Sequence, residues 1–188
     1  MAGHTGDPDG ARALAGDPSP VVRATVLSAL ARLGDIADDD VTAALADPSP
    51  VVRRRACEVA VMRPSVDLRP ALQDADRGVV EAAAWALGER GEASAGAVSD
   101  LARVATGHDD PLCREAAVAA LGAIGHEAGL PAILDALDDR PAVRRRAVIA
   151  LAPFSGPEVD AALARAQGDR DRQVRQAAED LSDGDADV

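Results

Sequence analysis

Few residues of this chain could perform chemistry, and they stand far apart in the sequence. Apart from carboxylates, the candidate bases, nucleophiles and metal ligands are His4, His108, His126, Cys57 and Cys113. Their spacing fits no metal-binding pattern, and the cysteines form no CxxC pair. The segment GHDDP at 107–111 places a histidine before two carboxylates. We interpret it as an inter-helix loop whose Asp caps the next helix, since Asp is a common helix N-cap.

Sequence signatures of common enzyme classes are absent. The chain contains no GxGxxG, Walker A, GxSxG or HExxH motif. Acidic pairs such as Asp39–Asp40 precede or join predicted helices, where carboxylates stabilise the helix N-terminus. The sequence therefore predicts a protein without a catalytic site, a cofactor or a bound metal.

The charge and the N-terminal segment narrow the range of partners. The 188 residues carry a formal net charge of -12, with 32 acidic and 20 basic residues. Nucleic-acid binding depends on a basic surface that neutralises phosphates, so we expect no nucleic-acid partner. The segment MAGHTGDPDG has no signal-peptide pattern, and no apolar run reaches membrane-spanning length. We expect a cytoplasmic protein without a membrane partner, with the monomer as the favoured state.

The apolar composition predicts an all-α fold. Apolar residues make up 47% of the chain, yet aromatic residues make up only 1%, namely Trp85 and Phe154. Sandwiches and mixed α/β enzymes normally rely on aromatic and β-branched side chains for packing. Here Ala, Leu and Val dominate, and Ala and Leu are strong helix formers.

A seven-residue segment, DPSPVVR, occurs at 17–23 and again unchanged at 47–53. Looser copies follow, and the position of the final Arg marks residues 23, 53, 80, 114, 144 and 175. The mean spacing of about 30 residues is typical of a solenoid of stacked repeats. Pro suits the first helical position, and we expect Ser19 and Ser49 to cap the helices with their hydroxyl groups.

Each marked position is followed by the apolar pattern of one helix face. A small residue stands three positions later in five units, at Ala56, Ala83, Ala117, Ala147 and Ala178. Gly34, Gly91 and Gly125 are stop signals for three of these helices. A shorter helical segment lies between each stop and the next marked position. Such hairpins bury their apolar faces only by stacking on neighbours.

The expected architecture is an all-α, right-handed solenoid of about six helix-turn-helix repeats. The repeat domain is expected at 10–181, between a flexible tail at 1–9 and an acidic flexible tail at 182–188. The approximate repeats are 10–34, 35–63, 64–91, 92–125, 126–156 and 157–181.

Four segments carry a resemblance to a known family. They are DPSPVVRATVLSALARLG (17–34), DPSPVVRRRACEVAV (47–61), DPLCREAAVAALGAIG (110–125) and DDRPAVRRRAVIALA (138–152). These resemble the short bacterial HEAT-like repeats of phycobilisome-lyase relatives. The resemblance implies a ladder between repeats, formed by the Asp of each segment and the Arg six residues later. The ladder residues on this pattern are Asp17, Arg23, Asp47, Arg53, Arg114, Asp138, Arg144, Asp169 and Arg175, and Val80 interrupts them.

The second helix of each hairpin in this architecture usually lines a concave face that binds partners. Positions one, two, five and nine after each marked residue are expected to be exposed there. From these we predict the partner-binding residues Trp85, Arg54, Arg55, Glu58, Met62, Glu81, Glu115, Arg145, Arg146 and Ile149. Two interpretations of Trp85 remain open, a binding anchor or packing between repeats. The Arg clusters at 53–55 and 144–146 are equally compatible with solvated helix faces.

These observations predict a noncatalytic scaffold, adaptor or regulatory subunit that binds a protein partner on the concave face. An alternative, which rests on the resemblance, is a chromophore-lyase-like accessory factor related to phycobilin lyases. A relationship to HEAT-like DNA glycosylases is disfavoured, because that activity requires a basic, aromatic-rich face.

The alanine positions generate a first testable prediction. Enlarging Ala83 or Ala117 to Leu should overpack the stack and lower the free energy of unfolding by roughly 1–3 kcal/mol. Denaturant or thermal unfolding measures the effect. An unchanged unfolding curve would contradict the repeat alignment.

Overall fold

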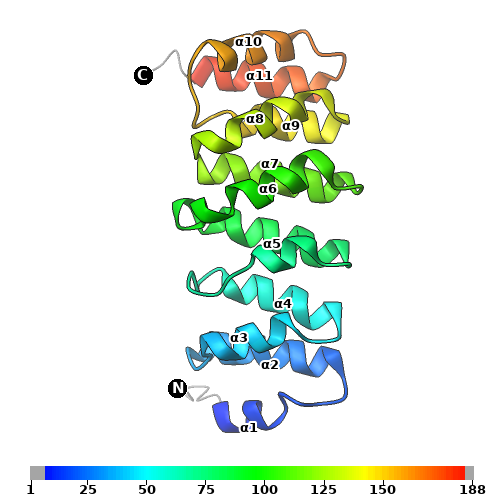
Figure 1. The fold of residues 1–188 in the computed structure, drawn as a ribbon, viewed down its shortest axis with the longest axis vertical. Helices are drawn as coiled ribbons and strands as arrows, with labels where there is room; N and C mark the ends of the chain where they lie inside the picture. The colour runs from blue at the N-terminus through cyan, green and yellow to red at the C-terminus, as the bar shows by residue number, and fades with distance from the viewer. Residues whose placement is uncertain (1–6, 185–188) are drawn as a thin grey trace, which may run out of the picture. The chain divides into compact units, whose positions relative to one another are not determined.

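A computed structural model of the chain describes residues 7–184. Every regular element in that range is helical, and the elements form an α-solenoid of helical repeats (Figure 1). With η denoting a 3-10 helix, they are α1 (Pro8–Ala13), α2 (Pro20–Leu33), α3 (Asp38–Leu45), α4 (Pro50–Ala60), η1 (Arg69–Gln73), α5 (Arg77–Glu89), η2 (Gly91–Ala97), α6 (Val98–Gly107), α7 (Pro111–Ile124), η3 (Glu127–Gly129), α8 (Leu130–Asp135), η4 (Ala136–Asp138), α9 (Pro141–Ala150), α10 (Pro157–Gln167) and α11 (Arg172–Gly184).

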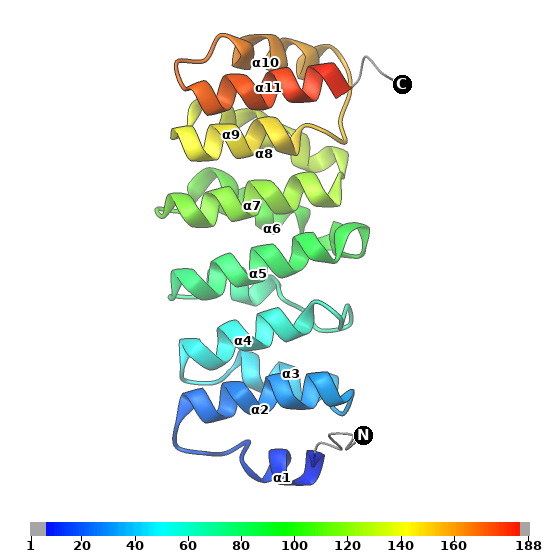
Figure 2. The same cartoon turned by 180° about the vertical axis from the view of Figure 1, so that it is seen from behind.

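Two compact units divide the chain, at 1–86 and 87–188. In the first unit α2 packs against α1 and α4, and α3 packs against α4. In the second unit α7 packs between α6 and α9, and α11 packs against α9 and α10 (Figure 2). We call α2, α4, α5, α7, α9 and α11 the B helices, because each begins at one of the repeated segments.

The two expected tails lie only partly within the described residues. Residues 1–6 and 185–188 are outside them. The helix α1 already includes Pro8 and Asp9, and α11 extends to Gly184.

Proline starts four of the B helices, as the sequence pattern predicts. Pro20 is the first residue of α2 and Pro50 the first residue of α4, where a missing N–H costs no hydrogen bond. The expected hydroxyl caps are wrong, because neither Ser19 nor Ser49 makes a side-chain cap bond. The carboxylate of Asp17 instead accepts the backbone N–H of Ser19, at 2.7 Å. The side-chain acceptor of this turn is thus the carboxylate of Asp17, two residues upstream of the serine that was expected to cap the helix.

The three predicted glycine stops all adopt the left-handed backbone conformation. Gly34 and Gly125 cap α2 and α7 with φ of 72° and 66°, and Gly91 follows α5 with φ of 56°. Glycine reaches this conformation without steric cost. One predicted helical segment is shorter than expected, since η1 is a five-residue 3-10 helix. Its Pro70 has no N–H to donate to a longer helix.

Small residues let neighbouring B helices approach closely. The alanine positions expected in the core, Ala56, Ala83, Ala117, Ala147 and Ala178, are completely buried. The closest approach is in the second unit, where α7 meets α9 at Gly122. A Cβ atom on Gly122 would lie 2.6 Å from the Cα atom of Ala150. This contact has no room for even one methyl group.

The last B helix differs from the others at one core position. Four residues after the marked position stand Leu27, Cys57, Ala84, Val118 and Val148, and all five are buried. In α11 the equivalent residue is Glu179, which is exposed. The outer face of α11 is therefore polar where the other B helices are apolar.

Gly122→Ala should destabilise the second unit, although alanine is the better helix former by about 1 kcal/mol. The new methyl group forces α7 away from Ala150, and we expect a net loss of about 1–3 kcal/mol in unfolding free energy. Denaturant unfolding tests the sign of the change. Gly107→Ala is the matched control, because nothing lies within 4 Å of its Cβ position. Equal stability of the two variants would show that the close approach is not tight.

Candidate functional site

Each ladder contact is made by one arginine that joins two neighbouring repeats. Arg23 donates from Nη1 to the backbone oxygen of Asp17, six residues earlier, at 2.8 Å. Its Nε and Nη2 donate to both carboxylate oxygens of Asp47 in the next repeat, at 2.8 and 2.7 Å. The same carboxylate accepts the backbone N–H of Ser49, at 2.8 Å. One arginine thus ties the start of α2 to the start of α4.

The same two-bond geometry recurs in both units. The further pairs are Arg53–Asp74, Arg114–Asp139 and Arg144–Asp169, with N–O distances from 2.6 to 2.9 Å. Both side chains of each pair are largely buried. Bidentate arginine–carboxylate pairs fix orientation as well as distance. In the last repeat, Arg175 keeps the bond to the backbone oxygen of Asp169, at 2.7 Å.

One ladder residue predicted from the sequence is wrong. Asp139, not Asp138, binds Arg114, and its backbone oxygen accepts from Arg144 at 2.8 Å. The side chain of Asp138 is 75% exposed and approaches Arg165 only to 3.5 Å. The turn before α9 is one residue shorter than the turns before α2 and α4. The aspartate and the arginine of this segment therefore stand five residues apart, not six.

A histidine replaces the ladder aspartate in the fourth repeat. The Nδ1 atom of His108 accepts the backbone N–H of Asp110, at 3.0 Å, and its backbone oxygen accepts from Arg114, at 2.7 Å. A carboxylate performs the first role in the other segments. In the third repeat Val80 takes the arginine position and is completely buried. The third repeat thus lacks a ladder arginine and the fourth lacks a ladder aspartate, and only Val80 is evident from the sequence pattern.

The arginine contacts lower the pKa of the ladder carboxylates. Asp47, Asp74, Asp139 and Asp169 each have a lowered pKa, chiefly because their ladder arginine donates hydrogen bonds to the charged form. Burial opposes the shift without reversing it. The carboxylates therefore stay ionised, and the contacts intact, well into the acidic range.

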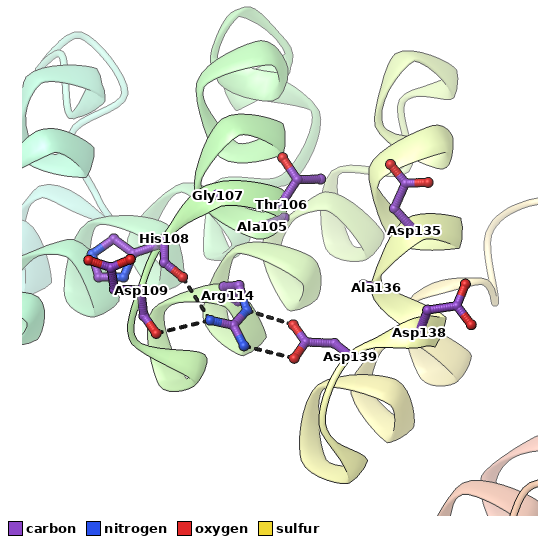
Figure 3. A pocket seen from close by; sticks show the side chains of 10 residues that line it. All are labelled: Ala105, Thr106, Gly107, His108, Asp109, Arg114, Asp135, Ala136, Asp138 and Asp139. Carbon is purple, nitrogen blue, oxygen red and sulfur yellow. Dashed lines mark hydrogen bonds and ion pairs between the residues drawn. The ribbon is translucent and has the colours of Figure 1, made fainter.

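A hollow of about 550 Å³ beside Arg114 is rich in carboxylates (Figure 3). The Arg114 guanidinium is occupied by Asp139 and by two backbone oxygens. The carboxylates of Asp135 and Asp138 lie apart from the His108 ring. Over residues 7–184, no cluster of three or more His, Cys, Asp or Glu side chains could hold a metal ion.

The outward face of the B helices in the first unit gathers six of the predicted partner-binding residues. We call it the B-face, defined by Val21, Val51, Arg54, Arg55, Glu58, Met62, Gly78, Glu81, Ala82 and Trp85. Trp85 is 47% exposed and Met62 is 86% exposed. About half of Trp85 is therefore accessible to solvent and half is packed, which is compatible with both of its interpretations. The Glu58 carboxylate approaches Arg54 at 3.4 Å and Arg55 at 2.6 Å.

Two shallow hollows cross the B-face and share Glu58. One, of about 760 Å³, lies between α2 and α4 and includes Val21, Val51 and Met62. The other, of about 290 Å³, lies between α4 and α5 and includes Trp85. Val21 and Val51, which are 63% and 50% exposed, were not predicted from the sequence. Their signal is a large apolar second residue in α2, α4 and α7, two positions before the ladder arginine.

The other four predicted partner-binding residues lie in the second unit. The Glu115 carboxylate approaches Arg146 at 3.5 Å. Ile149 is exposed on α9, and Arg145 is half-buried. Leu112, the second residue of α7, is exposed like Val21 and Val51. This part of the chain thus has its own apolar and cationic surface on α7 and α9.

The family model described as HEAT repeats matches residues 39–118 and 98–182, which together make up most of the chain. The chain belongs to the HEAT repeat family. No curated protein matches this HEAT repeat protein significantly in sequence.

Solved structures similar to this HEAT repeat protein share its fold at low sequence identity. A designed armadillo repeat protein in complex with the peptide (KR)4 has a TM-score of 0.70 and 19% identity, over 94% of this chain and 98% of that one. The complex of CpcE and CpcF of phycocyanin lyase from Nostoc sp. has a TM-score of 0.63 and 22% identity, over 95% and 77%. Human deoxyhypusine hydroxylase has a TM-score of 0.53 and 21% identity, over 94% and 83%.

No helix of residues 7–184 combines the length and the apolar character needed to cross a membrane.

Asp139→Asn should weaken the second unit and change its response to acid. Loss of the charged acceptor for Arg114 should lower the unfolding free energy at neutral pH by about 1–3 kcal/mol. Because the folded pKa is depressed, the wild-type contribution is complete above the unfolded pKa of about 3.9 and disappears as pH falls through the folded value.

Denaturant unfolding at a series of pH values measures both effects. The variant should lose less stability than the wild type on acidification below about pH 5. Asp138→Asn is the matched control, and we expect it to leave the stability unchanged. A larger loss of stability in Asp138→Asn than in Asp139→Asn would support Asp138 as the ladder residue, as the sequence pattern predicted.

Proposed function

We propose that this HEAT repeat protein is a noncatalytic scaffold or adaptor that binds a protein partner on its B-face. The observation that carries the proposal is the grouping of Val21, Val51, Met62 and Trp85, all strongly exposed, along two adjoining hollows. Large apolar side chains grouped at the surface of a soluble protein are typical of interaction sites. Tryptophan and arginine are also the residues most enriched at the energetic centre of interfaces.

The relatives are compatible with this function but do not name a partner. The designed armadillo repeat protein was solved with a bound peptide, and repeat solenoids commonly bind extended ligands along a face. The likeness to the phycocyanin lyase complex extends to the backbone at 22% identity, and it transfers no lyase chemistry to this chain.

Trp85→Ala should remove partner binding without unfolding the protein. The partner is first identified by affinity capture from the native cell, then purified, and its dissociation constant is measured by titration. We expect binding to weaken about 30-fold or more, the effect of removing an interface hot spot. Far-ultraviolet circular dichroism and the melting temperature should stay close to those of the wild type, because the ring is half exposed.

Leu14→Ala is the control, because Leu14 is 49% exposed, follows α1 and lines neither hollow of the B-face. It should leave the dissociation constant unchanged. Equal binding by Trp85→Ala and the wild type would refute the proposal. So would unfolding of Trp85→Ala, since Trp85 would then be a core residue.

A further inference from the structure

We propose that the hollow beside Trp85 is an anchor site for one large apolar side chain of an acidic linear segment in the partner. This inference rests on the proposed function and specifies the chemistry of the partner. The hollow has a volume of about 290 Å³ and lies between the adjacent helices α4 and α5. It is lined by Arg54, Glu58, Gly78, Glu81, Ala82 and Trp85.

Two small residues of α5 line the hollow. The second residue of α2 is Val21, that of α4 is Val51 and that of α7 is Leu112, and each is a large exposed side chain. The second residue of α5 is Gly78, which lines the hollow. Ala82, one turn later, is also small. The first two turns of α5 therefore leave an open space next to the Trp85 ring.

The space suits an apolar group more than a charged one. An indole ring and two small residues form much of its lining, and burial of an apolar side chain against them is favourable. The carboxylate of Glu58, at the border with the second hollow, is already paired with Arg54 and Arg55. An incoming apolar side chain thus meets no unpaired charge at that border.

The cations of the adjoining hollow favour acidic residues next to the anchor. Arg54, Glu58 and Glu81 line the anchor hollow itself, and the adjoining hollow adds Arg32, Arg55 and Arg63, so that the two together carry a net charge of +2 against -12 for the whole chain. Of these arginines, Arg63 is also paired with Asp38, at 3.0 Å. Each guanidinium has five N–H donors, and one carboxylate of Glu58 serves both Arg54 and Arg55. The side chains of Arg54 and Arg55 are 63% and 45% exposed. Arg32 is exposed at the rim and has no ion-pair partner among the described residues.

A linear segment fits this arrangement because the binding features lie in sequence across neighbouring helices. The hollow of α2 and α4 leads into the hollow of α4 and α5 through their shared Glu58. Figure 2 shows α2 and α4 side by side in this part of the chain. An extended chain that passes from one hollow to the other meets residues of both, Met62 in the first and Trp85 in the second.

Peptide selection on the full chain tests the inference. A displayed library of random linear peptides is selected on the wild type and counter-selected on Gly78→Val, which restores the side chain found in α2 and α4. A Cβ on Gly78 meets only Oδ1 of Asp76, at 3.1 Å, and this oxygen accepts the backbone N–H of Gly78 at 2.9 Å, so the carboxylate has to shift by a few tenths of an ångström. The substitution should fill part of the hollow, and denaturant unfolding of Gly78→Val confirms that the variant compared is folded.

We expect the enriched peptides to combine one large apolar residue with flanking Asp or Glu. Trp85 is the sole tryptophan and the chain has no tyrosine, so its emission reports binding at this position directly. Affinity should fall about tenfold or more in Gly78→Val and when the peptide anchor is changed to Ala. It should also fall with rising salt. Gly16→Val, in an open loop of the same unit, should bind like the wild type.

Enrichment of basic peptides, binding that survives Gly78→Val, or failure to enrich any peptide would each overturn the inference. The proposed function is decided separately by capture of the native partner. If that partner depends on Trp85 but presents a basic or folded surface, the scaffold function stands and the acidic-anchor inference fails. If capture is independent of Trp85, the proposed function fails, and the peptide selection still decides the chemistry of the hollow.

Discussion

The structure depends on an arginine that must satisfy two repeats at once. Each ladder guanidinium binds a backbone oxygen of its own turn and the carboxylate of the following turn. That carboxylate also closes its own turn by accepting a backbone N–H. A change of turn length in one repeat is therefore constrained by the repeat before it. The short turn before α9 obeys this constraint by supplying Asp139 in place of the residue that precedes it.

This arrangement separates the structural residues of a B helix from those that can vary. Positions three and seven after the ladder arginine are buried in helix after helix, and glycine or alanine sets how closely the helices approach. The B-face residues are free of both demands, apart from small ones such as Ala82. They differ from repeat to repeat, as Ser28, Glu58, Trp85 and Ile149 show at one equivalent position. Surface chemistry can change there while the stack is kept.

The fold was predictable from sequence because its determinants are periodic. Proline at helix starts, glycine at helix ends and alanine at the close approaches recur about every 30 residues, so each repeat supports the reading of the others. The misplaced ladder aspartate concerns a feature that is not periodic. Counting residues could not distinguish Asp138 from Asp139, because both are aspartates and only the turn length decides.

Part of the candidate site was also predictable, because helix positions recur with a regular period. Helical periodicity placed Trp85, Met62 and Arg54 on one face, since positions three or four residues apart share a face. It gave no sign that His108 accepts the bond of an aspartate, because the residue type differs. It also passed over Gly78, since a hollow depends on the helix across from it, which no local pattern contains.

The charge of Glu179 limits how a further repeat could be added to α11. A further hairpin stacked on α11 would cover a position that is buried in the five other B helices, and a carboxylate without a partner there would lose its hydration. Graft designs would have to replace it with an aliphatic residue such as the valine of α7 or α9. The same replacement without a graft would leave an adhesive apolar end, with the risk of head-to-tail fibres.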